Sequence, residues 1–195
     1  LDAIAFENLK FAIAQPHGMI LVTGPTGCGK TSTLYCAIQE LNKPNKNIIT
    51  IEDPVEYQLQ GINQVQAHAQ IGLTFARGLR SILRQSPDII MVGEIHDDET
   101  ATVATQAAVS GLLVFSTLHT NDAAGAVARM IYMGVDTFML SASMLCAQSQ
   151  RLFRKLCTAC RQPTDMPADI LRMQRIDPKA LEGVTLYKPV GCPKC

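Results

Sequence analysis

The sequence predicts an α/β protein in which helices cover a parallel β-sheet, followed by a small cysteine-rich segment. Short apolar runs rich in β-branched residues alternate with stretches of helical periodicity, and this alternation is typical of strand–helix–strand units. The alternation stops near residue 150, where Cys, Pro and charged residues take over. We therefore expect a main domain over residues 1–150 and an appendage over residues 151–195.

Punctuating residues place the elements in order. Gly111 and Gly134 follow helical patterns as C-terminal stops. A stretch at residues 138–145 has apolar residues at helical spacing, which predicts a core helix. A further short helix is expected at residues 168–175. Strands are expected at residues 19–23, 47–51, 88–93 and 112–117. The other helices are expected at residues 30–41, 74–84, 98–110 and 122–133.

Charge and composition exclude several classes of protein. The chain has 17 basic and 17 acidic residues, which argues against the basic surface of a nucleic-acid-binding protein. Residues 1–150 carry 8 basic and 13 acidic side chains, whereas residues 151–195 carry 9 and 4. No apolar run reaches the roughly 20 residues of a membrane-spanning helix, and the start does not resemble a signal peptide. We therefore expect a cytoplasmic protein. Its last residue, Cys195, is a candidate metal ligand, which suggests a fragment of a longer chain.

The strongest motif lies between the first expected strand and the first expected helix. It matches the phosphate-binding loop, in which glycines let the backbone wrap around phosphates and backbone N–H groups attract the negative charge. Lys30 would reach the β- and γ-phosphates, and the hydroxyl of Thr31 would hold Mg²⁺. The loop comprises Gly24, Pro25, Thr26, Gly27, Cys28, Gly29, Lys30 and Thr31.

A candidate general base follows the third expected strand. Glu94 comes directly after the apolar run at residues 88–93, and the carboxyl ends of parallel strands face the ligand crevice in open α/β sheets. Glu94 would lie beside the phosphate loop if its strand neighboured the strand that precedes the loop. A cap of the following helix is the structural alternative for this residue.

Together these residues resemble the secretion ATPase superfamily that powers type II secretion and type IV pilus assembly. Besides the phosphate loop, residues 51–57 are similar to the acidic box of that family, residues 93–97 to its second nucleotide motif, and residues 116–122 to its histidine box. The resemblance implies a RecA-like core, a hexameric ring and Mg²⁺-dependent ATP hydrolysis. It also implies that Glu52 and Asp53 position metal and water, and that His119 senses the γ-phosphate.

The resemblance further implies a peripheral location at the inner membrane, with an assembly platform as partner. Two positions depart from the family pattern: Cys28 replaces the usual Ser, and His96 the usual Arg. Cys28 places a thiol at a helix N-terminus, where the thiolate is favoured. Arg77 and Arg80 lie three residues apart on one helix, and either phosphate in a neighbouring subunit or a surface ion pair would suit them.

The appendage contains two Cys-x₂-Cys pairs separated by 31 residues. Such pairs bind one tetrahedral Zn²⁺, and the closed loop stabilises a segment that has few apolar residues. Unpaired structural thiols or a redox pair are the alternatives. The resemblance implies that this module marks the secretion and assembly branch of the family. The four expected ligands are Cys157, Cys160, Cys192 and Cys195.

Two further cysteines, Cys36 and Cys146, fall in apolar helical patterns and are expected in the core. For the chain as a whole, two other functions stay open beside the secretion motor. One is a RecA-like ATPase acting on nucleic acid, which the neutral charge and the scarcity of aromatic residues disfavour. The other is a scaffold that binds nucleotide without hydrolysing it.

Overall fold

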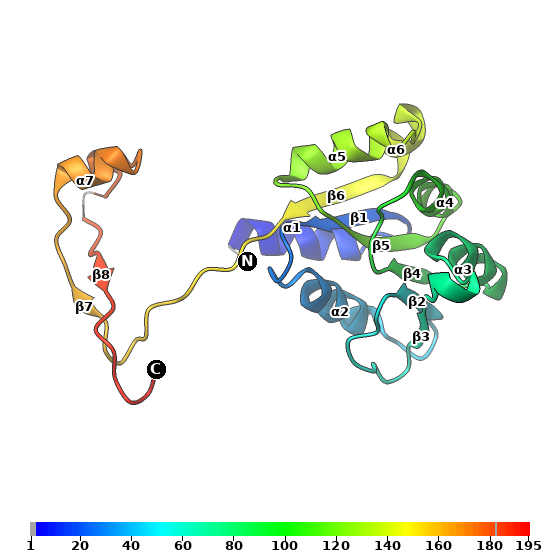
Figure 1. The fold of residues 1–195 in the computed structure, drawn as a ribbon, viewed down its shortest axis with the longest axis horizontal. Helices are drawn as coiled ribbons and strands as arrows, with labels where there is room; N and C mark the ends of the chain where they lie inside the picture. The colour runs from blue at the N-terminus through cyan, green and yellow to red at the C-terminus, as the bar shows by residue number, and fades with distance from the viewer. Residues whose placement is uncertain (1–2, 182) are drawn as a thin grey trace. The chain divides into compact units, whose positions relative to one another are not determined.

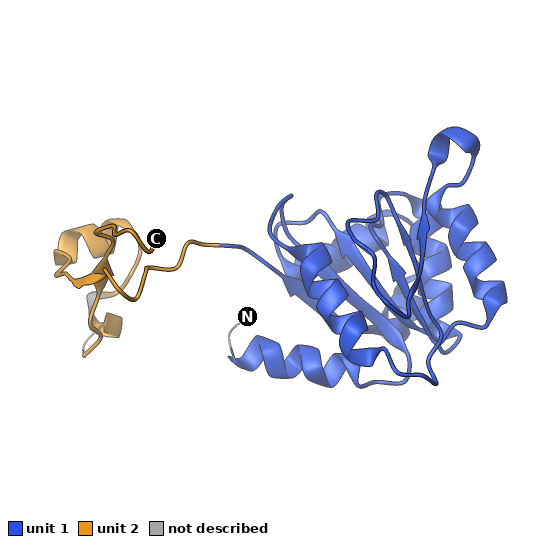
Figure 2. Ribbon diagram, turned by 90° about the horizontal axis from the view of Figure 1, so that it is seen from below, with its two compact units in different colours: residues 1–152 blue, residues 153–195 orange. Residues whose placement is uncertain are grey.

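The computed structural model describes residues 3–181 and 183–195. The chain divides into two compact units, residues 1–152 and residues 153–195 (Figure 2). The first unit is the sheet and its helices, and the second is the cysteine-rich segment. Among the described residues, none of the helices has both the length and the apolar character that a membrane crossing needs.

The first unit is built on a six-stranded parallel sheet with the order β3-β2-β4-β5-β1-β6 (Figure 1). The four predicted strands are present and fully buried, as expected of a sheet covered on both faces. The predicted α/β fold class is confirmed. The strands are β1 (Gly18–Thr23), β2 (Ile48–Glu52), β3 (Asn63–Gln66), β4 (Ile89–Val92), β5 (Leu113–Leu118) and β6 (Met144–Ser149).

Helices cover the two faces of the sheet unequally. The helices α1 (Ala3–Ile13) and α2 (Lys30–Leu41) pack with side chains from one face, including Phe115 and Ile20. The opposite face packs against four helices, so each face has its own apolar cluster. These four are α3 (Phe75–Ile82), α4 (Asp98–Val109), α5 (Ala123–Tyr132) and α6 (Thr137–Ser143).

Side-chain caps begin the helices of the second face. The side chains of Thr74, Asp97, Asp122 and Asp136 accept hydrogen bonds from backbone N–H groups in the first turns of α3, α4, α5 and α6. After α4 and α5, glycines at positions 111 and 134 adopt φ values of +110° and +80°, which agrees with their expected role as stops. Capping thus explains the helix boundaries that the sequence predicted.

The stretch at residues 138–145 differs from the expected core helix. Helix α6 ends at Ser143 and strand β6 begins at Met144. Phe138 is 79% exposed, whereas Leu140 is buried. The prediction failed because the apolar residues of a short helix and of the strand that follows it happen to share helical spacing. Strand β3 was also missed, since its Asn-Gln-Val-Gln sequence lacks the apolar character of a buried strand.

The second unit has little regular structure. A two-stranded antiparallel ribbon joins β7 (Gln162–Pro163) to β8 (Tyr187–Lys188), and between them lie α7 (Ala168–Met173) and a 3₁₀ turn at Pro178–Leu181. Within the described part of this unit, Leu171 is the one hydrophobic side chain that is buried. A segment with so small a core depends on another source of stability.

The central strand β5 generates a stability prediction. Phe115 is fully buried between the sheet and helices α1 and α2. We expect Phe115→Ala to lower the free energy of unfolding by about 3–5 kcal/mol, because the large cavity cannot fully collapse. The control is Phe11→Ala on α1, where the ring is 72% exposed, with an expected change within about 0.5 kcal/mol. Urea denaturation measures both, and equal losses would contradict the assigned packing.

Candidate functional site

The phosphate-binding loop connects β1 to α2, and its backbone requires glycine. Gly24, Gly27 and Gly29 have φ values of +146°, +77° and +84°, a region that other residues rarely adopt. Gly29 is also the N-cap of α2, and without a side chain it leaves the first backbone N–H groups of the helix open to an anion. The loop therefore has the conformation that anion binding needs.

Lys30 lies at the centre of the loop. Its side chain is largely buried, and Nζ donates hydrogen bonds to the carbonyl oxygens of Gly24, at 2.9 Å, and Pro25, at 3.1 Å. These two bonds use two of the three N–H donors of the ammonium group. The loop thus closes around a fixed positive charge at the start of α2.

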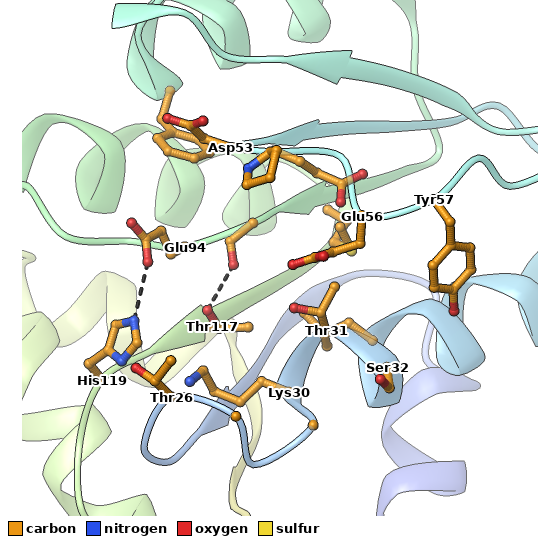
Figure 3. Close-up of a pocket in the computed structure, with 18 residues that line it drawn as sticks. Thr26, Lys30, Thr31, Ser32, Asp53, Glu56, Tyr57, Glu94, Thr117 and His119 are labelled. Atoms are coloured by element: carbon orange, nitrogen blue, oxygen red, sulfur yellow. Dashed lines mark hydrogen bonds and ion pairs between the residues drawn. The ribbon is translucent and has the colours of Figure 1, made fainter.

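A cavity of about 640 Å³ opens beside the loop, within the range of about 300–1,000 Å³ that is common for ligand pockets. In Figure 3 the side chains of Lys30, Thr31, Glu94 and His119 surround the same space. Three residues of the phosphate loop that were predicted for the site, Gly24, Pro25 and Cys28, do not line the cavity. The predicted residues that do are Thr26, Gly27, Gly29, Lys30, Thr31, Glu52, Asp53, Glu94 and His119.

Several lining residues were not predicted as site residues. Glu56 and Tyr57 belong to the acidic box, and the polar and aromatic residues after the end of β2 were a signal that could have found them. Ser32 follows directly on the phosphate loop. Pro54, Gly93 and Thr117 fall within the acidic box, the second nucleotide motif and the histidine box, so those motifs could have found them. Nothing in the sequence pattern marked Leu34, Phe75 and Met91, which come from α2, α3 and β4.

Glu94 reaches the cavity by a different arrangement from the one expected. Strand β5 lies between β4 and β1, so the strand of Glu94 is not a neighbour of the strand before the loop. All three strands nevertheless end at the same edge, and the side chains of Glu94 and His119 meet there with Oε2 and Nε2 3.2 Å apart. Glu94 Oε1 also lies 3.5 Å from Nδ1 of His96. Two imidazole rings therefore flank this carboxylate.

Glu52 occupies a buried polar network at the end of β2. Its Oε1 accepts hydrogen bonds from Thr50 Oγ1, at 2.6 Å, and Gln64 Nε2, at 3.1 Å, and its Oε2 accepts one from the hydroxyl of Tyr35 on α2. Burial, followed by the bond to Glu52, raises the pKa of Tyr35 well above its usual value, so the phenol remains a neutral donor. The carboxylate links α2 to β2, while the neighbouring Asp53 is exposed.

The two arginines of α3 have partners within this chain. Arg77 Nη1 donates to the carbonyl oxygen of Gly72 at 2.8 Å, and Arg80 Nη1 lies 2.5 Å from Oε1 of Glu99 on α4. The surface ion pair considered from the sequence is therefore formed by Arg80.

Two of the three cysteines of the first unit differ from expectation. Cys36 is exposed on α2, so its predicted core position is wrong. Cys146 is half-buried on strand β6 rather than on a helix, and burial raises the pKa of its thiol. Cys28 is 4% exposed, because its side chain turns inward from the loop. Apolar spacing in the sequence did not show that Cys36 lies on the exposed face of its helix, or that Cys146 lies on a strand instead of a helix.

The second unit brings its four cysteines together. The sulfur atoms of Cys157, Cys160, Cys192 and Cys195 all lie within 4.8 Å of one another. The separations include 4.0 Å for Cys157–Cys192 and 3.7 Å for Cys160–Cys195. A tetrahedral Zn²⁺ with bonds of about 2.3 Å has sulfur atoms about 3.8 Å apart. The donor set and its spacing therefore fit zinc.

The pKa values of two thiols in this cluster are shifted in opposite directions. A hydrogen bond from the backbone of Ala159 is the largest cause that lowers the pKa of Cys157. Burial, followed by the neighbouring thiols, raises the pKa of Cys160 to about 11. Crowded thiolates repel one another, and a divalent cation removes that repulsion. The cluster therefore has the chemistry of a metal site.

Comparison with known proteins identifies the relatives of this site. The family model for type II/IV secretion system proteins matches residues 3–195. The chain is 52% identical over 189 residues to the type II secretion system ATPase E of Vibrio cholerae serotype O1, covering 97% of this chain and 37% of that protein. It is 50% identical over 190 residues to the type IV pilus assembly ATPase PilB of Thermus thermophilus, covering 97% of this chain and 21% of that protein.

Solved structures agree with the sequence relatives. The pilus retraction motor PilT with bound ADP superimposes with a TM-score of 0.61 at 38% identity, over 73% of this chain and 41% of that one. The ATPase DotB of Legionella pneumophila gives a TM-score of 0.60 at 34% identity, over 69% of this chain and 39% of that one. With a family match over nearly its whole length, this chain belongs to the type II/IV secretion system protein family.

Proposed function

We propose that this chain is the nucleotide-binding part of a hexameric, Mg²⁺-dependent ATPase that powers type II protein secretion or type IV pilus assembly. One observation carries the proposal: the phosphate-binding loop with Lys30 and the Glu94–His119 pair line a single cavity. The names of the Vibrio and Thermus relatives, a secretion ATPase and a pilus assembly ATPase, support the same process.

The cavity residues have distinct roles in hydrolysis. Lys30 neutralises phosphate charge, and the backbone N–H groups at the start of α2 orient the phosphate oxygens. Glu94 accepts the proton of the attacking water, and His119, 3.2 Å away, donates a hydrogen bond to the γ-phosphate. Thr31 and Asp53, which line the cavity, would supply the oxygen atoms that suit Mg²⁺. Bound Mg²⁺ would neutralise the charge that develops on the transferred phosphoryl group.

Glu52 supports this chemistry from the buried polar network at the end of β2. Its two oxygens are engaged by three donors of the protein, so it holds the end of β2 in place and presents Asp53 and Glu56 to the cavity. This anchoring is how we propose that Glu52 contributes to the positioning of metal and water.

The four-cysteine unit has a structural role in this proposal. Four thiolates fill the coordination sphere of Zn²⁺ and leave no open position for catalysis. The nine basic and four acidic residues at 151–195 give a net charge of +5, and a Zn(Cys)₄ centre of −2 leaves about +3. We propose that this basic module faces an acidic platform protein or anionic headgroups at the cytoplasmic face of the inner membrane.

Two substitutions test the assignment of binding and hydrolysis to different residues. Lys30→Ala should abolish binding of a fluorescent ATP analogue, because the phosphate charge loses its counter-charge. Glu94→Gln should leave binding intact and slow phosphate release by about 10²–10⁴-fold, because it keeps the shape and removes the base. Lys43→Ala and Glu7→Gln, at sites outside the cavity, are the matched controls. Equal loss of ATP affinity in both variants would contradict the role of Glu94.

The same assays separate the alternative functions. Stimulation of ATP turnover by single-stranded DNA would favour an ATPase that acts on nucleic acid. Nucleotide binding without any turnover, in the hexameric protein that contains this chain, would favour a scaffold.

Zinc removal should affect the two units differently. We expect one Zn²⁺ per chain in protein purified without chelator, and we expect chelation to unfold residues 153–195 while the first unit still binds ATP. Elemental analysis and limited proteolysis measure these outcomes. Cys157→Ser should lose the metal, whereas the control Cys36→Ser should retain it. Loss of ATP binding together with zinc would show that the metal does more than stabilise the small unit.

A further inference from the structure

The residue that follows strand β6 touches the phosphate-binding loop. Gln150 Nε2 donates a hydrogen bond to the carbonyl oxygen of Cys28 at 2.7 Å. Its Oε1 accepts one from Thr33 Oγ1, on the first turn of α2, at 2.8 Å. A single amide side chain therefore joins the loop and the helix whose N-terminus the loop precedes.

The backbone that carries this side chain is itself fixed. The N–H of Gln150 donates to the carbonyl oxygen of Thr23 at the end of β1, at 2.8 Å. The Arg151 guanidinium donates to the carbonyl oxygens of Gln150, at 2.9 Å, and Asn121, at 2.6 Å. A Cβ at Gly24 would lie 2.5 Å from Gln150 O, so the loop and this segment are in close contact.

The bond to Cys28 determines the orientation of one peptide group. A trans peptide holds its C=O and its N–H on opposite sides. With the carbonyl oxygen of Cys28 held towards Gln150, the N–H of Gly29 points away from Gln150. Gly29 lines the cavity, and a Cβ there would lie 3.0 Å from Gln150 Nε2. The amide thus acts on the N-cap residue of α2, where an anion would bind.

We propose that Gln150 is a positioning residue for the phosphate-binding loop, which holds the Cys28–Gly29 peptide in its anion-binding orientation. The inference rests on the proposed nucleotide-binding function. It adds a residue that takes no part in the hydrolytic step itself. Gln150 does not line the nucleotide cavity. It acts through Cys28 and Thr33, so its removal changes affinity for phosphate rather than the hydrolytic step.

The main variant is Gln150→Met, which keeps the length of the side chain and removes both hydrogen bonds. We expect the Kd for ATP and the Kd for inorganic pyrophosphate to rise together by roughly 3–10-fold, the typical effect of losing one hydrogen bond, because only the bond to Cys28 orients the loop peptide. The KM for ATP should rise by the same factor while kcat stays within about twofold. Thr33→Val should weaken both ligands less, and the double variant should be no worse than Gln150→Met alone.

Matched controls separate this role from a merely structural one. Gln15→Met removes an amide that also donates to a carbonyl oxygen, that of Phe11, at 3.0 Å, and it should leave both Kd values unchanged. Binding is measured on the 195-residue chain, and KM and kcat on the hexameric protein that contains it, at a temperature where every variant is folded. A lower Tm for Gln150→Met with unchanged Kd values would overturn the proposal.

Three other results would also count against it. Gln150 lines an apolar groove between α1 and α2, so a Kd that rose for ATP but not for pyrophosphate would indicate a contact with the base instead of the loop. If the unaltered chain bound neither ligand, the proposed nucleotide site itself would fail. Binding by the unaltered chain with no effect of Gln150→Met would overturn the role of Gln150 alone.

Discussion

Parallel pairing is the constraint on which the rest of this protein depends. Every strand of a parallel sheet ends at the same edge, so loops that are distant in the sequence meet there. The phosphate loop follows β1, the acidic box follows β2, Glu94 follows β4 and His119 follows β5. The cavity forms because these four strands are adjacent in the order β2-β4-β5-β1.

Polar side chains then connect that edge to the helix that follows the loop. Tyr35 on α2 donates to the buried Glu52 of β2, and Thr33 on the same helix donates to Gln150 after β6. The two bonds run from this one helix towards opposite edges of the sheet, one to β2 and one to the end of β6. A buried carboxylate is costly without donors, and the three donors around Glu52 offset that cost. Helix α2 is therefore held at one side by Glu52, which lines the cavity, and at the other by Gln150, which contacts the phosphate loop.

The two units solve the problem of stability in different ways. The sheet of the first unit buries an apolar cluster on each face, which is sufficient for a domain of this size. The second unit has 43 residues and one buried hydrophobic side chain among those described, Leu171. Its four sulfur atoms lie at separations that match a tetrahedral metal site, and a metal bound there would take the place of a core.

The sequence by itself predicted the four central strands β1, β2, β4 and β5, the helices α2 to α5, the conformation of the phosphate loop and the pairing of the four cysteines, because these depend on local periodicity, on glycine conformation and on ligand spacing. It could not determine that β5 separates β1 from β4, that Cys36 is exposed, or that β6 is a strand, since each depends on which elements pack together. The contact of Gln150 with Cys28 spans 122 residues of sequence. Only the tertiary structure decided it, because strand order in the sheet, not local sequence, brings the end of β6 to the loop after β1.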